Sequence, residues 1–190
     1  MEKTDLVEIR WHGRGGQGAV TSAELLARAA ISEGKFAQAF PSFGTERRGA
    51  PVTAFTRISA QKPIRIRAGI TEPDIVIIFD ATLLRIINVT EGLKDGGIVV
   101  VNSPKSIAEL KADFGGKSRL AVLNASHIAR ETLKVNIVNT TMLGALVKAT
   151  GVVQLDSLLE PVQDRFGRLA ERNINAMKRA IEETVIEGVA

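Results

Sequence analysis

The chain has 190 residues, a formal net charge of +4 and no cysteine. This length favours a single domain over residues 1–190 with a core of its own. The absence of cysteine excludes disulfides, a thiolate nucleophile and cysteine-bound iron–sulfur clusters within this chain. The first residues hold no apolar signal core and the longest apolar runs are strand-sized, so we expect a cytoplasmic protein without a membrane span.

A glycine-rich turn separates the first two predicted elements, a strand over residues 6–11 and a helix over 20–32. It has the G-x-G-x-x-G spacing and consists of Gly13, Arg14, Gly15, Gly16, Gln17 and Gly18. Such a turn can present backbone N–H groups to a phosphate at a helix N-terminus. Residues 36–44 lack the acidic residue that an NAD site needs. Another phosphate site, a subunit interface and a tight turn packed on a neighbour remain open.

A basic stretch follows the second predicted strand, which covers residues 35–40. Residues 46–67 contain six arginines and lysines against one acid, and Arg47 and Arg48 lie in the turn-rich loop 41–51. Residues 52–58 and 64–68 alternate apolar and polar positions, which predicts an antiparallel pair at a sheet edge. The stretch has one aromatic residue, Phe55, so we favour an anion site or an acidic partner over nucleic acid. A solvated hairpin face is the simpler alternative.

Three apolar runs, residues 74–80, 97–102 and 119–124, predict strands buried on both faces. Helical patterns follow each run, at residues 81–88, 106–113 and 125–133. Three more helices, without a further strand, are predicted at 140–150, 155–166 and 168–187. This order predicts an α/β fold: a three-layer α/β/α, Rossmann-like, mostly parallel sheet with an antiparallel edge hairpin and C-terminal helices.

The first strand departs from this pattern because polar Glu8, Arg10 and His12 alternate with apolar positions. A half-polar first strand predicts either an edge position or a face covered by another chain. Trp11 lies on the apolar side and is expected in the core.

Catalytic residues are not recognisable in the chain. Its two histidines, His12 and His127, lie in no metal-binding spacing, and no serine stands in a G-x-S-x-G elbow. Asp80, at the end of a predicted strand, is the carboxylate that we consider for a ligand site. We therefore expect no catalytic residue and no metal site here, and a subunit whose chemistry resides on a partner.

Two long motifs, at residues 11–18 and 38–51, resemble the gamma subunits of the 2-oxoacid:ferredoxin oxidoreductase family, in particular those of pyruvate:ferredoxin oxidoreductase (pyruvate synthase). The similarity extends more loosely through residues 139–145. It implies a Rossmann-like chain, inactive alone, that assembles with alpha, beta and delta subunits and works with ferredoxin. Thiamine diphosphate, magnesium and [4Fe-4S] clusters would belong to those subunits, and neither nucleic acid nor a membrane would be a partner.

The resemblance also implies that this chain helps to form the coenzyme A side of the active site. Arg47 and Arg48 could bind its phosphates, and residues 13–18 could offer backbone N–H groups or contact a neighbouring chain, with Gln17 bonding across the contact. An intersubunit ion pair is the alternative for the arginines. The oxo acid could instead be 2-oxoglutarate, a branched-chain acid or an arylpyruvate. A stand-alone NADP-binding protein is the alternative of a different class.

Overall fold

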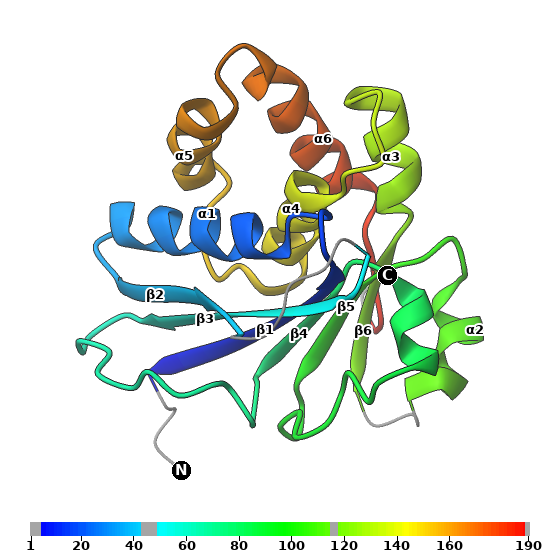
Figure 1. Ribbon diagram of the computed structural model, residues 1–190, viewed down its shortest axis with the longest axis horizontal. Helices are drawn as coiled ribbons and strands as arrows, with labels where there is room; N and C mark the ends of the chain where they lie inside the picture. The colour runs from blue at the N-terminus through cyan, green and yellow to red at the C-terminus, as the bar shows by residue number, and fades with distance from the viewer. Residues whose placement is uncertain (1–4, 43–48, 115–117, 189–190) are drawn as a thin grey trace.

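The computed structural model describes residues 5–42, 49–114 and 118–188, and these form one seven-stranded sheet with helices packed on it (Figure 1). The strands are β1 (Leu6–Arg14), β2 (Phe36–Pro41), β3 (Pro51–Ser59), β4 (Ile75–Ile78), β5 (Ile98–Asn102), β6 (Arg119–Leu123) and β7 (Val185–Ile186). The α-helices are α1 (Ala19–Ser32), α2 (Ile107–Leu110), α3 (Ala125–Thr132), α4 (Asn139–Thr150), α5 (Asp156–Phe166) and α6 (Ala170–Glu183).

The sheet order is β2-β3-β1-β4-β5-β6-β7. Strands β1, β4, β5 and β6 are mutually parallel, while β3 runs antiparallel to both β1 and β2, and β7 antiparallel to β6. Five of the seven strands therefore point the same way. The predicted α/β class with a mostly parallel sheet and an antiparallel edge is confirmed.

The two faces of the sheet are covered unequally (Figure 1). Helices α1 and α3–α6 lie over one face and enclose the larger core, which includes Trp11 with no exposed surface. The opposite face carries α2, two 3₁₀ turns (Ala81–Arg85 and Lys111–Phe114) and loops over a smaller core. The helix predicted at residues 81–88 is thus only a 3₁₀ turn. The helix predicted at 106–113 is the four-residue α2 followed by the second 3₁₀ turn.

The prediction that the first strand lies at an edge or has a face covered by another chain is wrong. β1 is third in the sheet, between β3 and β4, and its polar side chains find partners within this chain. The Glu8 carboxylate accepts from Arg57 Nε at 2.8 Å, and Arg10 Nη2 donates to the Val89 carbonyl at 3.0 Å. Loops of the chain itself therefore cover this face, leaving His12 only 6% exposed.

Two further predictions of strand and helix are corrected by the sheet. Residues 64–68 form no strand, because β3 already pairs with β1 on one side and with β2 on the other. The last predicted helix ends at Glu183, where Thr184 turns extended and β7 joins β6. A seventh strand thus lies in the C-terminal third, where none was predicted.

Candidate functional site

The glycine turn connects β1 to α1 and is closed by bonds within itself. The Gln17 N–H donates to the Arg14 carbonyl at 3.0 Å, and the Arg14 N–H donates to Gln17 Oε1 at 2.7 Å. The side-chain oxygen of Gln17 therefore takes part in closing the turn. The first turn of α1 has no side-chain cap.

Gly18 is required by both its backbone and its surroundings. Its φ of +85° lies in the left-handed region, and a Cβ there would approach the Asn139 Cβ to 2.9 Å. The Ser22 hydroxyl also donates to the Asn139 carbonyl at 3.2 Å. Gly18 thus allows the N-termini of α1 and α4 to lie close together. At this position the structure has the tight turn packed on a neighbour that was one of the alternatives.

An ion pair joins the carboxyl ends of β1 and β4. Arg14 Nε lies 2.7 Å from Asp80 Oδ2, and Arg14 Nη2 donates to the Thr82 hydroxyl at 2.8 Å. The connections of β1 and β4 lead to opposite sides of the sheet, so this is the topological switch point where open α/β sheets bind ligands. Asp80 therefore lies where open α/β sheets bind ligands, as its place after a strand predicted.

The Asp80 carboxylate stays ionised in this setting. Burial raises its pKa, but hydrogen bonds from the Thr82 side chain and backbone, together with the Arg14 guanidinium, outweigh that effect and leave the pKa below its usual range. The Arg14–Asp80 pair consequently places no net charge at the switch point. A charged ligand would need additional basic groups beside it.

The basic loop is tied to the glycine turn at its described end. The Gly15 N–H donates to the Ala50 carbonyl at 2.9 Å, and the Gly49 N–H donates to the Gly15 carbonyl at 3.2 Å. Arg14 Nη1 also donates to the Gly49 carbonyl at 3.1 Å. Arg47 and Arg48 themselves lie outside the described residues. The structure thus brings the turn next to the chain segment that immediately follows both arginines.

A crevice of about 340 Å³, lined mostly by residues with polar side chains, opens beside the turn, at the carboxyl ends of β4, β5 and β6. It is lined by Gln17, Phe79, Asp80, Ala81, Thr82, Asn102, Pro104, Asn124, Ser126, Arg130 and Asn136. Asn102 is fixed there, because its amide donates to the Phe79 carbonyl and the Ser126 hydroxyl, both at 2.9 Å. Sequence reasoning missed Asn102 and Asn124, although each directly ends or follows an apolar strand run, the same signal that pointed to Asp80.

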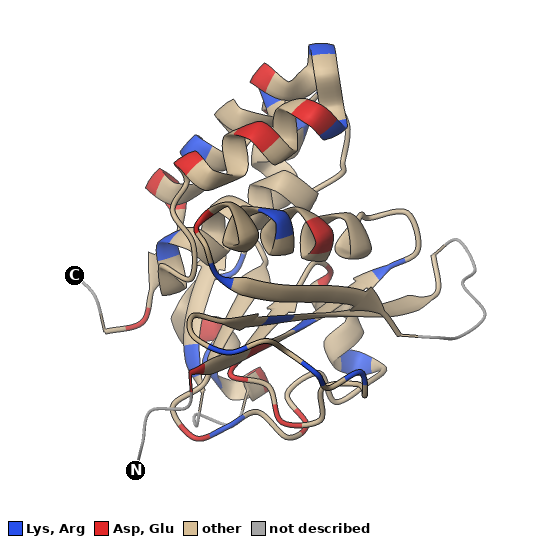
Figure 2. Cartoon of the chain, turned by 90° about the vertical axis from the view of Figure 1, so that its left-hand side faces the viewer, with Lys and Arg blue, Asp and Glu red and all other residues tan. Residues whose placement is uncertain are grey.

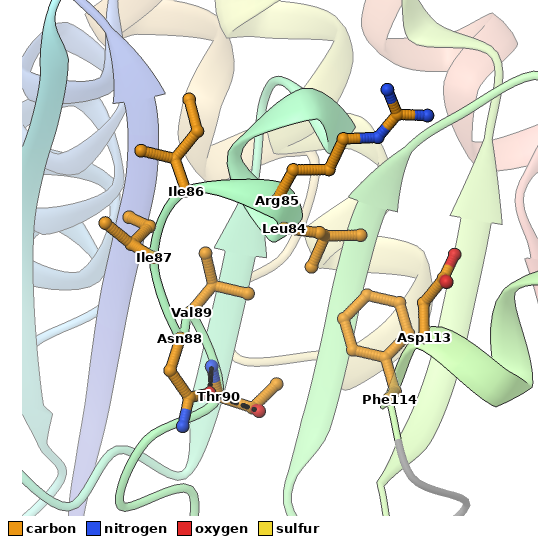
Figure 3. Close-up of a pocket in the computed structure, with 9 residues that line it drawn as sticks. All are labelled: Leu84, Arg85, Ile86, Ile87, Asn88, Val89, Thr90, Asp113 and Phe114. Carbon is orange, nitrogen blue, oxygen red and sulfur yellow. Dashed lines mark hydrogen bonds between the residues drawn. The ribbon is translucent and has the colours of Figure 1, made fainter.

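A second cavity, of about 360 Å³, lies on the thinly covered face of the sheet (Figure 3). It is formed by the irregular segment 84–90 together with Asp113 and Phe114. Leu84 and Phe114 face each other across it, and Ile86 points away and is 59% exposed. None of the residues predicted for a site lies here, so the switch-point crevice is the better candidate.

The described residues contain no group of three histidine, aspartate or glutamate side chains close enough to hold a metal ion. Within the same residues, no helix is both long and apolar enough to cross a membrane.

Comparisons with known proteins point in one direction. The family described as pyruvate ferredoxin/flavodoxin oxidoreductase matches residues 8–183. A common gamma subunit of pyruvate/ketoisovalerate oxidoreductases from Thermococcus kodakarensis is 54% identical over 183 residues, covering 95% of this chain and 98% of that protein. A pyruvate synthase subunit PorC from Methanocaldococcus jannaschii is 51% identical over 179 residues, covering 94% and 97%.

A solved structure extends the similarity to the fold. The pyruvate oxidoreductase subunit PORC from Thermotoga maritima superposes with a TM-score of 0.85 at 38% identity, covering 96% of this chain and 98% of that chain. Each of these matches runs along nearly the full length of both proteins.

Proposed function

The chain belongs to the pyruvate ferredoxin/flavodoxin oxidoreductase family, and we propose that it works as the gamma subunit of a pyruvate:ferredoxin oxidoreductase. The resemblance read from residues 11–18 and 38–51 is thereby confirmed. The observation that carries the proposal is sequence identity of about one half, over nearly the whole chain, to the subunits from Thermococcus kodakarensis and Methanocaldococcus jannaschii. The relatives give no sign of the stand-alone NADP-binding alternative.

In the proposed reaction, pyruvate and coenzyme A yield acetyl-coenzyme A and carbon dioxide, and two electrons pass to ferredoxin. Thiamine diphosphate with magnesium supplies the decarboxylation chemistry, and [4Fe-4S] clusters carry the electrons. We assign these groups to alpha, beta and delta subunits. The composition of this chain supports that division, because without cysteine it offers no thiolate ligands for a cluster.

The part that we propose for this chain is to complete the coenzyme A side of the active site and to support assembly. Arginine is suited to phosphate because its planar guanidinium can donate two parallel hydrogen bonds. The anchoring of Gly49 to Gly15 and Arg14 supports a shared role for the basic loop and the glycine turn. Arg47 and Arg48 would add the positive charge that the neutral Arg14–Asp80 pair does not provide.

We further propose that this chain does not choose the oxo acid. The Thermococcus relative is named as common to pyruvate and ketoisovalerate oxidoreductases, so in that organism one gamma chain serves two substrates. By the same logic the pocket that reads the oxo acid lies on another subunit. Exchanging those other subunits, with this chain kept constant, should change the preferred 2-oxo acid.

The isolated chain is expected to be inactive, because its sequence offers neither a nucleophile nor cluster ligands. Purified alone, it should not reduce a viologen dye with pyruvate, coenzyme A and thiamine diphosphate. The same chain co-expressed with its partner subunits should do so. Reduction of the dye by the isolated chain would contradict its assignment as a subunit.

Arg47→Ala and Arg48→Ala are expected to raise the Michaelis constant for coenzyme A in the assembled complex. Loss of a charge-assisted bond to a phosphate costs about 1.5–3 kcal/mol, or roughly ten- to a hundredfold in binding. Arg65→Ala is the matched control, since Arg65 is an exposed arginine of the same basic stretch. An unchanged constant in complexes that assemble normally contradicts the phosphate role, whereas failed assembly assigns the pair to an interface.

A further inference from the structure

Strand β2 forms a bare edge of the sheet. Within the described residues it pairs with β3 alone, and its sequence, Phe-Ala-Gln-Ala-Phe-Pro, contains no charged residue. Figure 2 looks onto this side of the molecule. Soluble proteins usually protect an edge of this length with charged side chains, a bulge or a covering segment. The opposite edge, β7, has only two residues. β2 is therefore the edge that can accept another strand.

The backbone of β2 has bonding groups to offer. The Ser42 N–H donates to the Thr53 carbonyl at 2.8 Å, so in this register the even-numbered residues exchange hydrogen bonds with β3. The N–H and C=O groups of Ala37 and Ala39 then point away from the sheet. Among the residues that the structure describes, none outside the strand ladder bonds to them.

The sequence of the edge is symmetric. Residues 36–40 read Phe-Ala-Gln-Ala-Phe in both directions. If two such strands pair antiparallel about a two-fold axis at Gln38, Ala37 of each copy lies opposite Ala39 of the other. Each of these two pairs exchanges two N–H···O bonds, while the two Gln38 residues face each other in the pair between them. An interface between identical copies requires this self-complementarity.

The aromatic residues fit the same arrangement. Phe40 is held in place by Phe55, with ring centroids 5.2 Å apart, and by Arg57, whose guanidinium carbon lies 5.6 Å from the Phe40 ring centre. Phe36 is 41% exposed. Two-fold pairing sets Phe36 of one copy opposite Phe40 of the other, so the exposed ring gains a cross-strand aromatic neighbour. We propose that β2 is a self-association surface through which two copies of this chain join their sheets.

A single introduced cysteine tests the register. Because the chain has no cysteine of its own, Gln38→Cys would place the only two thiols of the pair in facing positions, with Cα atoms about 4.5 Å apart, which is within disulfide range. Under mild oxidation we expect a covalent dimer of twice the 20.4 kDa chain mass. Phe36→Cys is the matched control, because its two copies would lie about 14 Å apart along the strands. Val185→Cys, on the opposite edge and 59% exposed, is the second control.

Sedimentation of the unmodified chain tests the same surface without a covalent bond. We expect a dimer that dissociates on dilution, with Gln38→Lys weakening association by about fivefold because like charges then face each other. Gln38→Thr and Val185→Lys should retain the dimer, and circular dichroism checks that each variant is folded. A chain that stays monomeric at all concentrations overturns the proposal. So does cross-linking at position 38 no faster than at positions 36 and 185.

Discussion

Gly144→Ala is expected to destabilise the chain by about 3 kcal/mol, although alanine is the better helix former. Gly144 lies inside α4 where this helix crosses α6, and an added Cβ would stand 2.3 Å from the Met177 carbonyl oxygen. That oxygen belongs to the backbone of α6, so no side chain can rotate away. The helices must instead separate, which breaks the packing of buried Met142 and Met177. Denaturant unfolding monitored by circular dichroism measures the loss.

The control for Gly144→Ala is Lys148→Ala, one turn further along the same helix at an exposed position. This change adds alanine to α4 without entering a contact, so its effect should stay within about 0.5 kcal/mol. A Gly144→Ala protein as stable as the unmodified chain would show that α4 and α6 can separate freely. The close approach would then play no part in the fold.

The interior of the sheet could be predicted from sequence because its signal is local. Strands β4, β5 and β6 are buried on both faces and read as continuous apolar runs. The spacing of alanine and leucine in α1 likewise marked the face that packs on the sheet. In each of these elements the residues themselves indicate which faces are buried. The alternation of strands and helices along the chain then restricts the possible topologies.

The position of β1 could not be predicted in this way, because its polar residues are satisfied by distant segments. Glu8 pairs with Arg57 from β3, and Arg10 reaches the carbonyls of residues 70 and 89. Alternation of polar and apolar residues normally indicates a solvent-facing side, whereas here it indicates buried ion pairs and carbonyl contacts. Strand β7 was not predicted for another reason: with two residues it is too short to show a periodic pattern of apolar residues.

The candidate site was predicted in part. The glycine turn and Asp80 were both singled out by their places at strand ends, and the structure joins them through Arg14. The Arg14–Asp80 contact itself spans 66 positions of sequence and has no local signal. The loosely similar segment 139–145 also acquires a physical meaning. Asn139 lies against Gly18, the Thr140 hydroxyl donates to Asn173 Oδ1 at 2.8 Å, and Gly144 permits the helix crossing.

His12 stands out among the buried polar groups because it must remain neutral. Its ring is 6% exposed, and Arg10 Nε donates to His12 Nε2 at 3.1 Å, which requires a free lone pair on that nitrogen. Burial first, and the Arg10 charge second, lower the pKa of His12 to about 4, and the Val89 carbonyl offsets them only in part. In the unfolded chain a histidine titrates near pH 6.5.

Unfolding stability should therefore fall as the pH drops from 7 to 5. In this range His12 is protonated in the unfolded chain but stays neutral in the folded chain. The contribution of His12 to the free energy of unfolding is therefore fully present above about pH 6.5 and is lost as the pH falls toward 4. At 1.36 kcal/mol per unit of pKa difference, the loss between pH 7 and pH 5 is about 2 kcal/mol, and it approaches 3 kcal/mol at lower pH. Urea titrations at half-unit pH steps measure it.

His12→Gln separates this cause from the titration of carboxylates. Glutamine can still accept the Arg10 hydrogen bond through its carbonyl oxygen but binds no proton, so stability should become nearly flat between pH 7 and pH 5. His127→Gln, which leaves the buried histidine in place, should keep the original slope. If both variants lose stability with falling pH as the unmodified chain does, another group must carry the dependence. His12 would then bind its proton equally well in the folded and the unfolded chain, and the hydrogen bond from Arg10 would not be strong enough to keep the ring neutral.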